Sequence, residues 1–588
     1  MSNSHSLTFF QPRIQIIIPI LLLLTAPMAT AVVYDIGPGR AYTSLGAFPF
    51  EQLEAGDIVN IHYRPDPYRE KVRIRAQGTP SSPVIIRGIP GPGGERPILD
   101  GINATTRSTD TYGYPPLQDL GLLIIYRSDT DPFEYKPKHI LLEGLEIRNA
   151  DAGSGNTFTD AAGLTRAWAE NACGIWALGV ENLTIRDCAI HTCGNGLFIA
   201  SKGEEETQSR NILVERCEIY GNSVPGSFFE HNIYTEGINT TFQYNYLGPI
   251  REGAQGGNLK DRSARAIIRY NWIQGGQRLI DLVEAQDSYP FVGGLPEYGD
   301  DYVYGNVLIT NPGDAGALVH YGGDSGLDQT YRKGTLHFYH NTVRILRDQS
   351  ELYRTHLFDI TSNEQTVDAR NNIVYVAPFT QGETPTNLQL SINAGIINLG
   401  VNWISPGWQP WTDNGTTVVG TINGASNVIG AADNLPGFAD LAANNLTLSQ
   451  DSPCIDIAQS LDAASAASFP VTMQYSFPRS AIARVSVGAA SDLGAFEFGL
   501  LAEEGEEGSP EGLNEGVIEG STEGSTEGST EGSTEGEGDG NAPVHSADID
   551  ANREINLSEL LRVVQLYNAR AYNYCPLQGT EDGFCPGQ

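Results

Sequence analysis

One short pattern recurs through the middle of this chain and limits what it can fold into. Seven segments read apolar-x-apolar-x-x-(Asn or Cys)-x-apolar, with one softened position allowed; they cover residues 183–190, 212–219, 240–247, 266–273, 301–308, 336–343 and 367–374, after an earlier relative at 140–147. The sixth position recurs every 26 to 35 residues and is occupied by Cys188, Cys217, Asn245, Asn271, Asn306, Asn341 and Asn372. Self-similarity at this period indicates a repeat architecture.

Each repeat alternates apolar and polar positions, as a β-strand does, and is bounded by the glycine, asparagine and aspartate residues that favour turns. The pattern therefore predicts coils of short strands rather than pairs of helices. An asparagine that returns once per coil suits a stacked turn, because its side-chain amide can bond to the asparagines above and below. We expect an all-β chain in which residues 32–498 form a single-stranded parallel β-helix, so that any function lies on the outer surface of a solenoid.

The two ends of the chain differ from this repetitive region. Arg13 precedes an apolar run over residues 16–24, and Ala29-Thr30-Ala31 fits the small-x-small cleavage rule. Residues 1–31 are therefore predicted to be a signal peptide, and the protein to be secreted or held at the cell surface; an uncleaved membrane anchor is the alternative. Residues 499–541 repeat Glu, Gly, Ser and Thr, which predicts an extended linker to a separate module over 542–588.

Charge and cysteine content exclude several classes of protein. The formal net charge is −35, which argues against nucleic acid as a partner, because phosphate binding needs local positive charge. Seven cysteines are too few for a disulfide scaffold of this length. Cys188 and Cys217 are expected to be buried thiols, with a cross-link as the alternative, whereas Cys575 and Cys585 are disulfide candidates. We expect a monomer.

One segment of this acidic chain is basic. Residues 251–278 hold only Glu252 and Asp261 against six basic side chains, Arg251, Lys260, Arg262, Arg265, Arg269 and Arg278. A charged solenoid face, paired with neighbouring carboxylates, is the plain interpretation of this segment. The register of the coils offers a sharper one.

Asn245 and Asn271 are 26 residues apart, so residues at that interval should stack in this part of the solenoid. If Ile233 and Leu259 face inward, alternation turns their neighbours outward, and the predicted stacked pairs are Asn232 with Asn258, Tyr234 with Lys260, and Glu236 with Arg262. We expect this outward column to be flanked by His231, Asp281, Glu284 and His320. Alternation points Asp261 inward, which suggests that the strand bends there.

These side chains suit β-elimination on a uronate-containing polysaccharide, an acidic partner. The reaction removes the proton at carbon 5 of a uronate whose carboxylate must be neutralised. Lys260 is the candidate base, since Arg262 and Arg265 nearby would lower its pKa from about 10.4. Tyr234 or His231 could protonate the leaving oxygen, and the arginines or a bound Ca²⁺ could hold the carboxylate. The remaining candidates are assigned to substrate binding: Asn232, Glu236, Asn258, Arg278, Asp281, Glu284 and His320.

Two other functions stay open. A glycoside hydrolase would need two carboxylates across the scissile bond, roughly 5 to 9.5 Å apart, and Glu236, Asp281 and Glu284 leave that possible. A non-catalytic solenoid that binds a glycan or a cell surface is the other. The nature of the product separates the three functions.

Over roughly residues 32–498 the chain resembles the right-handed parallel β-helix proteins of the pectate-lyase-like superfamily. The features that carry the resemblance are the coils, Lys260, and two segments that resemble a closing coil, 452–456 and 492–497. Residues 257–263, Gly-Asn-Leu-Lys-Asp-Arg-Ser, followed by Ile-Arg-Tyr-Asn at 268–271, resemble the lysine-bearing stretch of the chondroitinase B and alginate lyase family. That resemblance implies Lys260 as the base and Ca²⁺ as the group that neutralises the uronate. The family's arginine would fall near Leu282, with Arg278 as a nearby substitute.

The terminal module carries a second motif. The spacing of its residues matches the ligand positions of an EF-hand calcium loop. Side chains at positions 1, 3, 5, 9 and 12 and a backbone carbonyl at position 7 would bind the ion. In the order of positions 1, 3, 5, 7, 9 and 12 the residues are Asp548, Asp550, Asn552, Glu554, Asn556 and Glu559. A helix would follow over 557–567. The motif resembles half of a dockerin, although Arg553 stands where glycine is usual, and it implies Ca²⁺ binding and a protein partner for the module. An acidic, helix-capping loop is the alternative.

Overall fold

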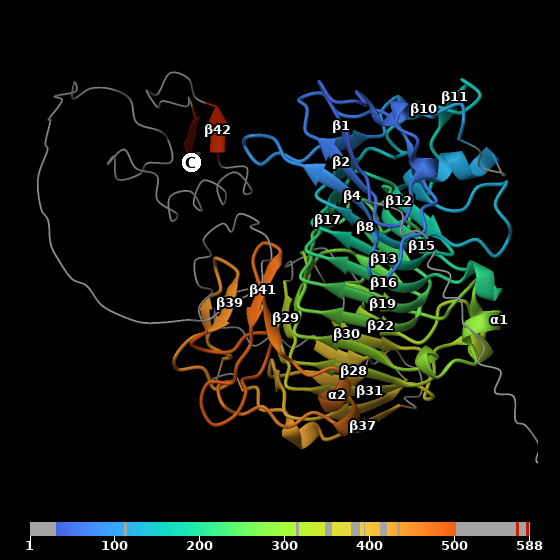
Figure 1. Ribbon diagram of the computed structural model, residues 1–588. Coiled ribbons are helices and arrows are strands. Elements are labelled where there is room, and N and C mark those ends of the chain that lie inside the picture. Colours follow the sequence, from blue (N-terminus) through green and yellow to red (C-terminus); the bar gives the residue numbers. More distant parts are fainter. Residues whose placement is uncertain are drawn as a thin grey trace, which may run out of the picture. The chain divides into compact units, whose positions relative to one another are not determined.

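The computed structural model describes residues 31–500, apart from 111–114, 313–316, 347–354, 378–387, 393, 412–419 and 432–434, and two short strands near the C-terminus. The chain divides into two compact units, Met1–Gly505 and Glu506–Gln588. Within the described residues the first unit is a solenoid of three long parallel sheets (Figure 1), as the recurring pattern predicts. No helix among these residues is both long and apolar enough to cross a membrane.

Each regular coil gives one strand to each sheet. The first sheet has 13 strands: β1 (Val33–Ile36), β2 (Ile58–His62), β4 (Val84–Ile89), β8 (Lys138–Glu143), β13 (Glu181–Arg186), β16 (Arg210–Glu215), β19 (Ile238–Gln243), β22 (Ala264–Arg269), β25 (Asp301–Tyr304), β28 (Thr335–Tyr339), β31 (Thr366–Arg370), β34 (Ile396–Leu399) and β37 (Thr421–Asn423). The second has 10: β5 (Ile98–Asp100), β9 (Glu146–Arg148), β14 (Ala189–His191), β17 (Glu218–Tyr220), β20 (Tyr246–Leu247), β23 (Trp272–Gln274), β26 (Val307–Ile309), β29 (Thr342–Ile345), β32 (Ile373–Val376) and β35 (Trp403–Ile404). The third, which carries the candidate site, has 11: β3 (Val72–Ile74), β7 (Gly121–Ile125), β12 (Cys173–Leu178), β15 (Asn195–Ala200), β18 (Ile233–Thr235), β21 (Leu259–Asp261), β24 (Ile280–Leu282), β27 (Ala317–Tyr321), β30 (Thr355–Ile360), β33 (Leu388–Ser391) and β36 (Gln409–Trp411).

The recurring asparagines form a ladder at the turn between the first and second sheets, as expected. Each side-chain oxygen accepts hydrogen bonds from the backbone N–H and the side-chain amide of the preceding member, at 2.9–3.1 Å, along Asn245, Asn271, Asn306, Asn341, Asn372 and Asn402. Cys188 and Cys217 continue this position as buried free thiols. Because each amide is satisfied by its neighbours, polar groups can stack inside the solenoid at no cost in unpaired donors.

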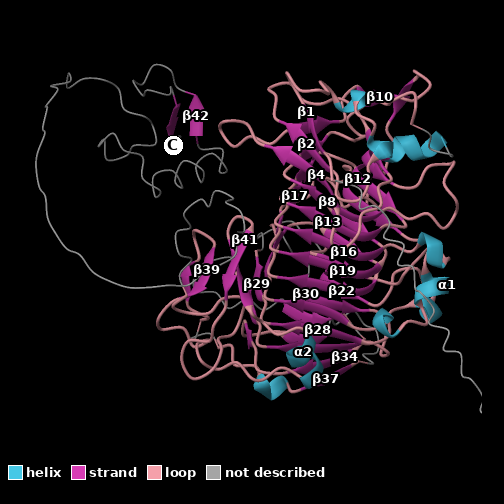
Figure 2. Cartoon of the chain, in the orientation of Figure 1, coloured by secondary structure: helices cyan, strands magenta, loops and turns pink. Residues whose placement is uncertain are grey.

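Two parts of the chain depart from the expected coils. Within 100–138 and 151–171, β6 (Ala104–Thr105), β10 (Thr157–Thr159) and β11 (Thr165–Ala167) form a small sheet. The helices are few and short (Figure 2): α1 (Tyr289–Val292), α2 (Ala463–Ser468), and 3₁₀ turns at Leu45–Ala47, Phe50–Gln52, Pro115–Leu120, Glu205–Thr207, Pro296–Tyr298, Asp328–Thr330 and Ala425–Asn427.

The segment after β37 does not close the stack as an added coil, so that expectation is wrong. It folds back as two hairpins, β38 (Phe438–Asp440) with β39 (Asn445–Leu448) and β40 (Met473–Ser476) with β41 (Ser480–Ala483), which lie beside the solenoid in Figure 1. Ala495 and Phe496 pack with Trp272 and Val307 of the second sheet. Large outward-facing side chains on that sheet need such a cover, because they would otherwise expose apolar surface to water.

In the second unit, β42 (Tyr572–Tyr574) pairs antiparallel with β43 (Phe584–Pro586). Outside the described residues lie 1–30 of the predicted signal peptide, 501–541 of the linker, Cys575 and the calcium loop, Asp548 to Glu559. The calcium and partner predictions therefore stay predictions.

Candidate active site

The outward-facing residues of the third sheet form one column, which runs from aromatic to charged side chains. Parallel pairing places these residues one above another: Phe198, Tyr234, Lys260, Asp281, His320 and Asp359. Tyr234 and Lys260 are thus side by side on one wall, as the spacing of 26 residues predicts, and Asp281 and His320 continue the same wall. We call this set the outward column.

Lys260 is held between two carboxylates. Its ammonium nitrogen lies 3.1 Å from Asp281 and 2.6 Å from Asp324, and the whole residue is only 9 % exposed. We expected Lys260 to face solvent with Arg262 and Arg265 nearby. Arg262 does lie beside it, on the other side of Asp324, but Lys260 is buried and Arg265 belongs to the first sheet. Burial alone would raise the pKa of Asp281 and of Asp324. Lys260, acting with His320 and Arg278 on Asp281 and with Arg262 on Asp324, outweighs burial and lowers both pKa values.

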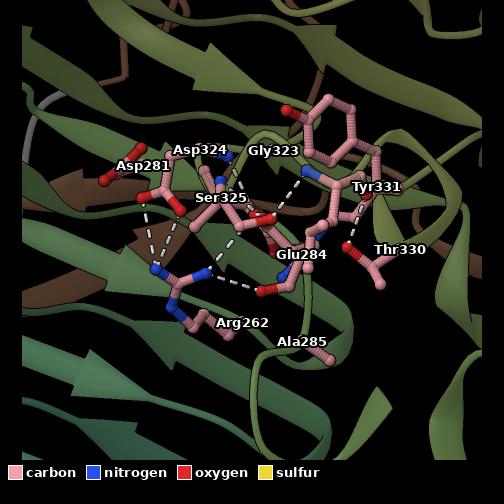
Figure 3. A network of polar contacts seen from close by, with 12 residues as sticks. Arg262, Asp281, Glu284, Ala285, Gly323, Asp324, Ser325, Thr330 and Tyr331 are labelled. Carbon is pink, nitrogen blue, oxygen red and sulfur yellow. Dashed lines mark hydrogen bonds and ion pairs between the residues drawn. The ribbon is translucent and has the colours of Figure 1, made fainter. Parts of the chain in front are cut away.

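Arg262 completes this ionic cluster from the neighbouring position (Figure 3). One of its terminal nitrogens lies 3.0 and 3.2 Å from the two oxygens of Asp324, and the other donates to the backbone oxygen of Glu284 at 2.8 Å. The carboxylate of Asp324 therefore lies between two cationic side chains, those of Lys260 and Arg262. We call these two cationic side chains the carboxylate cradle.

The column continues through a second set of ion pairs. Asp281 contacts Nδ1 of His320 at 2.7 Å and Arg278 at 3.2 Å, and Arg278 reaches Asp359 at 3.2 Å. Nε2 of His320 lies 3.2 Å from the hydroxyl of Thr361. Positive and negative groups thus alternate along the wall, so the pocket is close to balanced in charge rather than basic.

Tyr234 and His231 supply neutral polar groups beside the cradle. Nε of Arg262 donates to the phenolic oxygen of Tyr234 at 2.7 Å, and burial raises the pKa of Tyr234 to about 12 although Arg262 opposes the rise. Burial, with the charge of Lys260, lowers the pKa of His231 to about 3. Nδ1 of His231 lies 2.9 Å from the backbone nitrogen and 3.2 Å from the backbone oxygen of Gly257, and the neutral ring carries one N–H in either tautomer. Both residues are therefore hydrogen-bond donors near neutral pH.

These groups line a pocket of about 720 Å³. Its walls include Tyr234, Lys260, Arg262, Arg278, Asp281 and Asp324. The volume lies in the range of sites for small molecules or a few sugar rings. The pocket opens on the outer face of the solenoid, where we expected function to lie.

Several predicted site residues lie elsewhere. Arg265 is on β22 in the first sheet, with a φ of 65°, and does not line the pocket. Asn232 and Asn258 stack as predicted but point inward and are fully buried, because they occupy a turn just before β18 and β21. There the amide of Asn232 donates to Asn258 at 3.1 Å and to Gly248 at 2.8 Å. They are ladder residues, and the expectation that they face outward is wrong.

Two predicted carboxylates fix loops instead of lining the pocket. Glu236 accepts from the backbone N–H groups of Asp287 and Ser288 at 2.9 and 2.7 Å, and burial raises its pKa. Glu284 accepts from the backbone N–H groups of Asp324 and Ser325 at 2.9 and 2.7 Å. Glu284 thereby holds the loop that carries Asp324 against the cradle.

The basic segment does not form one patch. Arg251 pairs with the buried Asp151 at 2.5 Å, and Arg269 contacts Gln243 and Tyr304 on the first sheet. Side chains that are close in sequence are distributed over different sheets. Of the six basic residues of this segment, three line the pocket: Lys260, Arg262 and Arg278.

Sequence reasoning missed two carboxylates of the pocket. Asp359 could have been found by extending the register, since His320 pairs with it across β27 and β30. Asp324 comes from a loop that follows β27, in the run Gly322-Gly323-Asp324-Ser325-Gly326. A glycine-rich loop signals a turn, but no periodicity indicates where its side chains reach.

Among the described residues, three metal-ligating side chains come close enough together to share an ion at His337, Asp368 and Asp462. That group lies outside the pocket. The sequence left open the possibility that Ca²⁺ binds in the pocket. Among the described residues, no group of three metal-ligating side chains in the pocket supports it.

One comparison with known proteins, that with a family model, agrees with the fold. A family model described as a right-handed β-helix region matches residues 139–293, and no curated protein matches. Similar solved structures include pectate lyase Pel9A, 12 % identical over 80 % of this chain and 97 % of that one, with a TM-score of 0.39. Others are a rhamnogalacturonan lyase, 11 % identical over 68 % and 87 % at 0.34, and the family 28 exopolygalacturonase of Yersinia enterocolitica, 11 % identical over 67 % and 78 % at 0.34. At such low similarity the activity has to be argued from the site.

Proposed function

We propose that this chain is an exported enzyme that cleaves uronate-containing polysaccharides by β-elimination in this pocket. The observation that supports the proposal most is the carboxylate cradle, in which Lys260 and Arg262 hold the carboxylate of Asp324 at 2.6–3.2 Å on the pocket wall. A uronate carboxylate that displaces the side chain of Asp324 would meet the same two cations. Neutralising that carboxylate is the main electrostatic requirement of the reaction.

The remaining groups fit the proton transfers. The amine of Lys260 would take the proton from carbon 5, the freed electron pair would form the double bond between carbons 4 and 5, and the bond from carbon 4 to the leaving oxygen would break. Tyr234 would give its phenolic proton to that oxygen; with a pKa of about 12, the phenol is protonated at neutral pH. Proton exchange through solvent then restores both side chains. Because Lys260 must be neutral to act, we expect the rate to rise toward alkaline pH.

Glycoside hydrolysis is the second candidate, and one observation favours it. Asp281 and Asp324 share the ammonium of Lys260, at 3.1 and 2.6 Å. Their oxygens therefore lie within about 6 Å of each other, which is close to the separation of the paired carboxylates of retaining glycosidases.

The test is a panel of polysaccharides given to the purified full chain, with alginate, pectate and glycosaminoglycans beside neutral glycans. Elimination makes an unsaturated uronate that absorbs in the ultraviolet, whereas hydrolysis makes reducing ends without that absorbance. Absorbance that increases on at least one acidic polysaccharide is the expected result. Reducing ends alone would transfer the proposal to hydrolysis, and neither product would leave a binding protein.

Asp324→Asn separates the two chemistries at the residue level, because it removes the charge of Asp324 and keeps its shape. For elimination, Asp324 only occupies the cradle, so the variant should stay active and bind acidic substrate as well as or better than the wild type. For hydrolysis, the loss of a reacting carboxylate should lower kcat about 100-fold or more. Glu364→Gln, which alters an exposed ion pair with Lys333, is the matched control.

Export and calcium binding by residues 548–559 belong to the same proposal. A secreted enzyme with a calcium-stabilised terminal module would be tethered to a partner while the solenoid acts on the glycan. Calcium titration of the full chain and of Glu559→Gln tests the loop: binding that is the same in both would remove it.

A further inference from the structure

Two adjacent aromatic side chains stand exposed at the mouth of the pocket. Phe228 is 62 % exposed and Phe229 is 80 % exposed, and both line the pocket. Exposed large apolar residues are ordinary when scattered singly, but an adjacent pair at the mouth of a polar pocket marks a surface that a ligand can cover.

The loop that carries the two rings is held by hydrogen bonds to itself and to the next coil. The hydroxyl of Ser223 donates to the backbone oxygen of Glu230 at 2.7 Å. The backbone N–H of Gly226 donates to Gly253 at 2.8 Å, and that of Gln255 donates to Ser227 at 2.9 Å. Binding on these rings would therefore cost little in ordering the loop.

The chemistry around the rings fits a sugar. A pyranose ring has an apolar C–H face and a rim of hydroxyl groups, and sites for such ligands combine aromatic surface with a few placed polar groups. Gln255 and Gln277 line the same pocket as the rings, together with charged residues of the outward column such as Lys260 and Asp281.

We propose that Phe228 and Phe229 form a stacking platform for a second sugar of the same glycan chain, next to the uronate that enters the carboxylate cradle. This inference rests on the proposed function, since its occupant is the chain being cleaved. The platform contacts a sugar away from the reacting bond. It therefore strengthens the binding of chains long enough to reach it and leaves the bond-breaking step unchanged.

The test uses the full chain with Phe228→Ala and Phe229→Ala, singly and together, and Phe228→Tyr as the conservative variant. Phe133→Ala is the matched control, because Phe133 is also exposed, at 44 %, and does not line the pocket. Retention in native gels containing alginate or pectate measures binding without requiring turnover. KM and kcat for oligouronates of two to six sugars measure the dependence on chain length.

We expect the double variant to bind the polysaccharide roughly tenfold more weakly, with a higher KM for the longer oligouronates and an unchanged kcat. Phe228→Tyr and Phe133→Ala should behave as the wild type. Retention of the double variant equal to that of the wild type would overturn the platform, and so would a wild type that no acidic polysaccharide retains.

The outcomes also separate the platform from the proposed function. Weakened retention with no cleavage by any variant would keep the platform and remove the enzyme. Cleavage by the double variant with an unchanged KM for every chain length would keep the enzyme and remove the platform. If light scattering showed a wild-type dimer and a monomeric double variant, the two rings would form an interface between copies, and the platform would be overturned.

Discussion

Two ionic clusters lie on opposite faces of one strand. Lys260 and Asp261 are neighbours on β21, and alternation sends their side chains to opposite sides of the third sheet. Inside the solenoid, Asp261 lies 3.0 Å from Arg332, which also contacts Asp301 at 2.6 Å, and all three side chains are almost completely buried. Outside, Lys260 meets Asp281 and Asp324 on the wall of an open pocket.

The difference between the clusters is access, not chemistry. Arg332 also donates to the backbone oxygens of Val283 and Asp261, and Asp261 accepts further bonds from Thr235, Thr240 and Ser263. The inner cluster is buried, and its partners are other groups of the core. It can therefore only hold coils together. The outer cluster has a side open to the pocket and can exchange a partner for a ligand, which is what a binding site requires.

The largest effect that tests this comparison should follow from breaking the inner cluster. Arg332→Met leaves Asp261 and Asp301 charged and unpaired in the core, which we expect to lower the free energy of unfolding by about 3–5 kcal/mol. Urea unfolding followed by circular dichroism measures it. Lys333→Met, at an exposed pair with Glu364, is the control and should cost under about 1 kcal/mol. Equal losses in the two variants would contradict the assignment of a structural role to Arg332.

A more gradual effect, spread over several pH units, should appear in the pH dependence of stability. The pKa of His231 is about 3 when folded, against an ordinary value of about 6.5 in the unfolded chain. Between these values the unfolded chain binds more protons, so stability falls on acidification, by at most about 1.4 kcal/mol per pH unit. His231→Gln should flatten this slope between pH 6.5 and 3 in unfolding experiments. An unchanged slope would show that His231 is not buried as a neutral ring.

The smallest effect on stability should come from the outer cluster. Asp324→Asn changes a half-open position whose cationic partners keep Asp281 and Glu284 nearby, so we expect a loss below about 1 kcal/mol in the same urea experiment. A loss as large as that of Arg332→Met would mean that the outer cluster is as structural as the inner one.

The regular part of this molecule could be predicted from its sequence, because stacking repeats the same residue in each coil. The asparagine ladder, the parallel strands and the pairing of Tyr234 with Lys260 all follow from spacing alone. Asp261 is instructive: alternation placed it inward correctly, but the expected bend is not needed, since Arg332, 71 residues later, supplies its partner.

The rest depended on contacts that no period encodes. Asp324 and Phe228 reach the pocket from loops between strands, and Arg332 reaches the core from the end of such a loop. Alternation along the strand wrongly placed Asn232 and Asn258 outward. Both residues lie in a turn just before a strand, and a turn does not follow the alternation of the strand. Residues 452–456 and 492–497 were taken as parts of a closing coil, because nothing in their spacing indicates contacts with outward side chains of the second sheet such as Trp272.

The most direct test of the account is the absorbance of unsaturated uronate produced by the wild type and by Lys260→Met, with Lys333→Met as the matched control. The account predicts product from the wild type and the control, and a loss of about 100-fold or more in Lys260→Met with the circular dichroism spectrum unchanged. Product formed by Lys260→Met at the wild-type rate would contradict it.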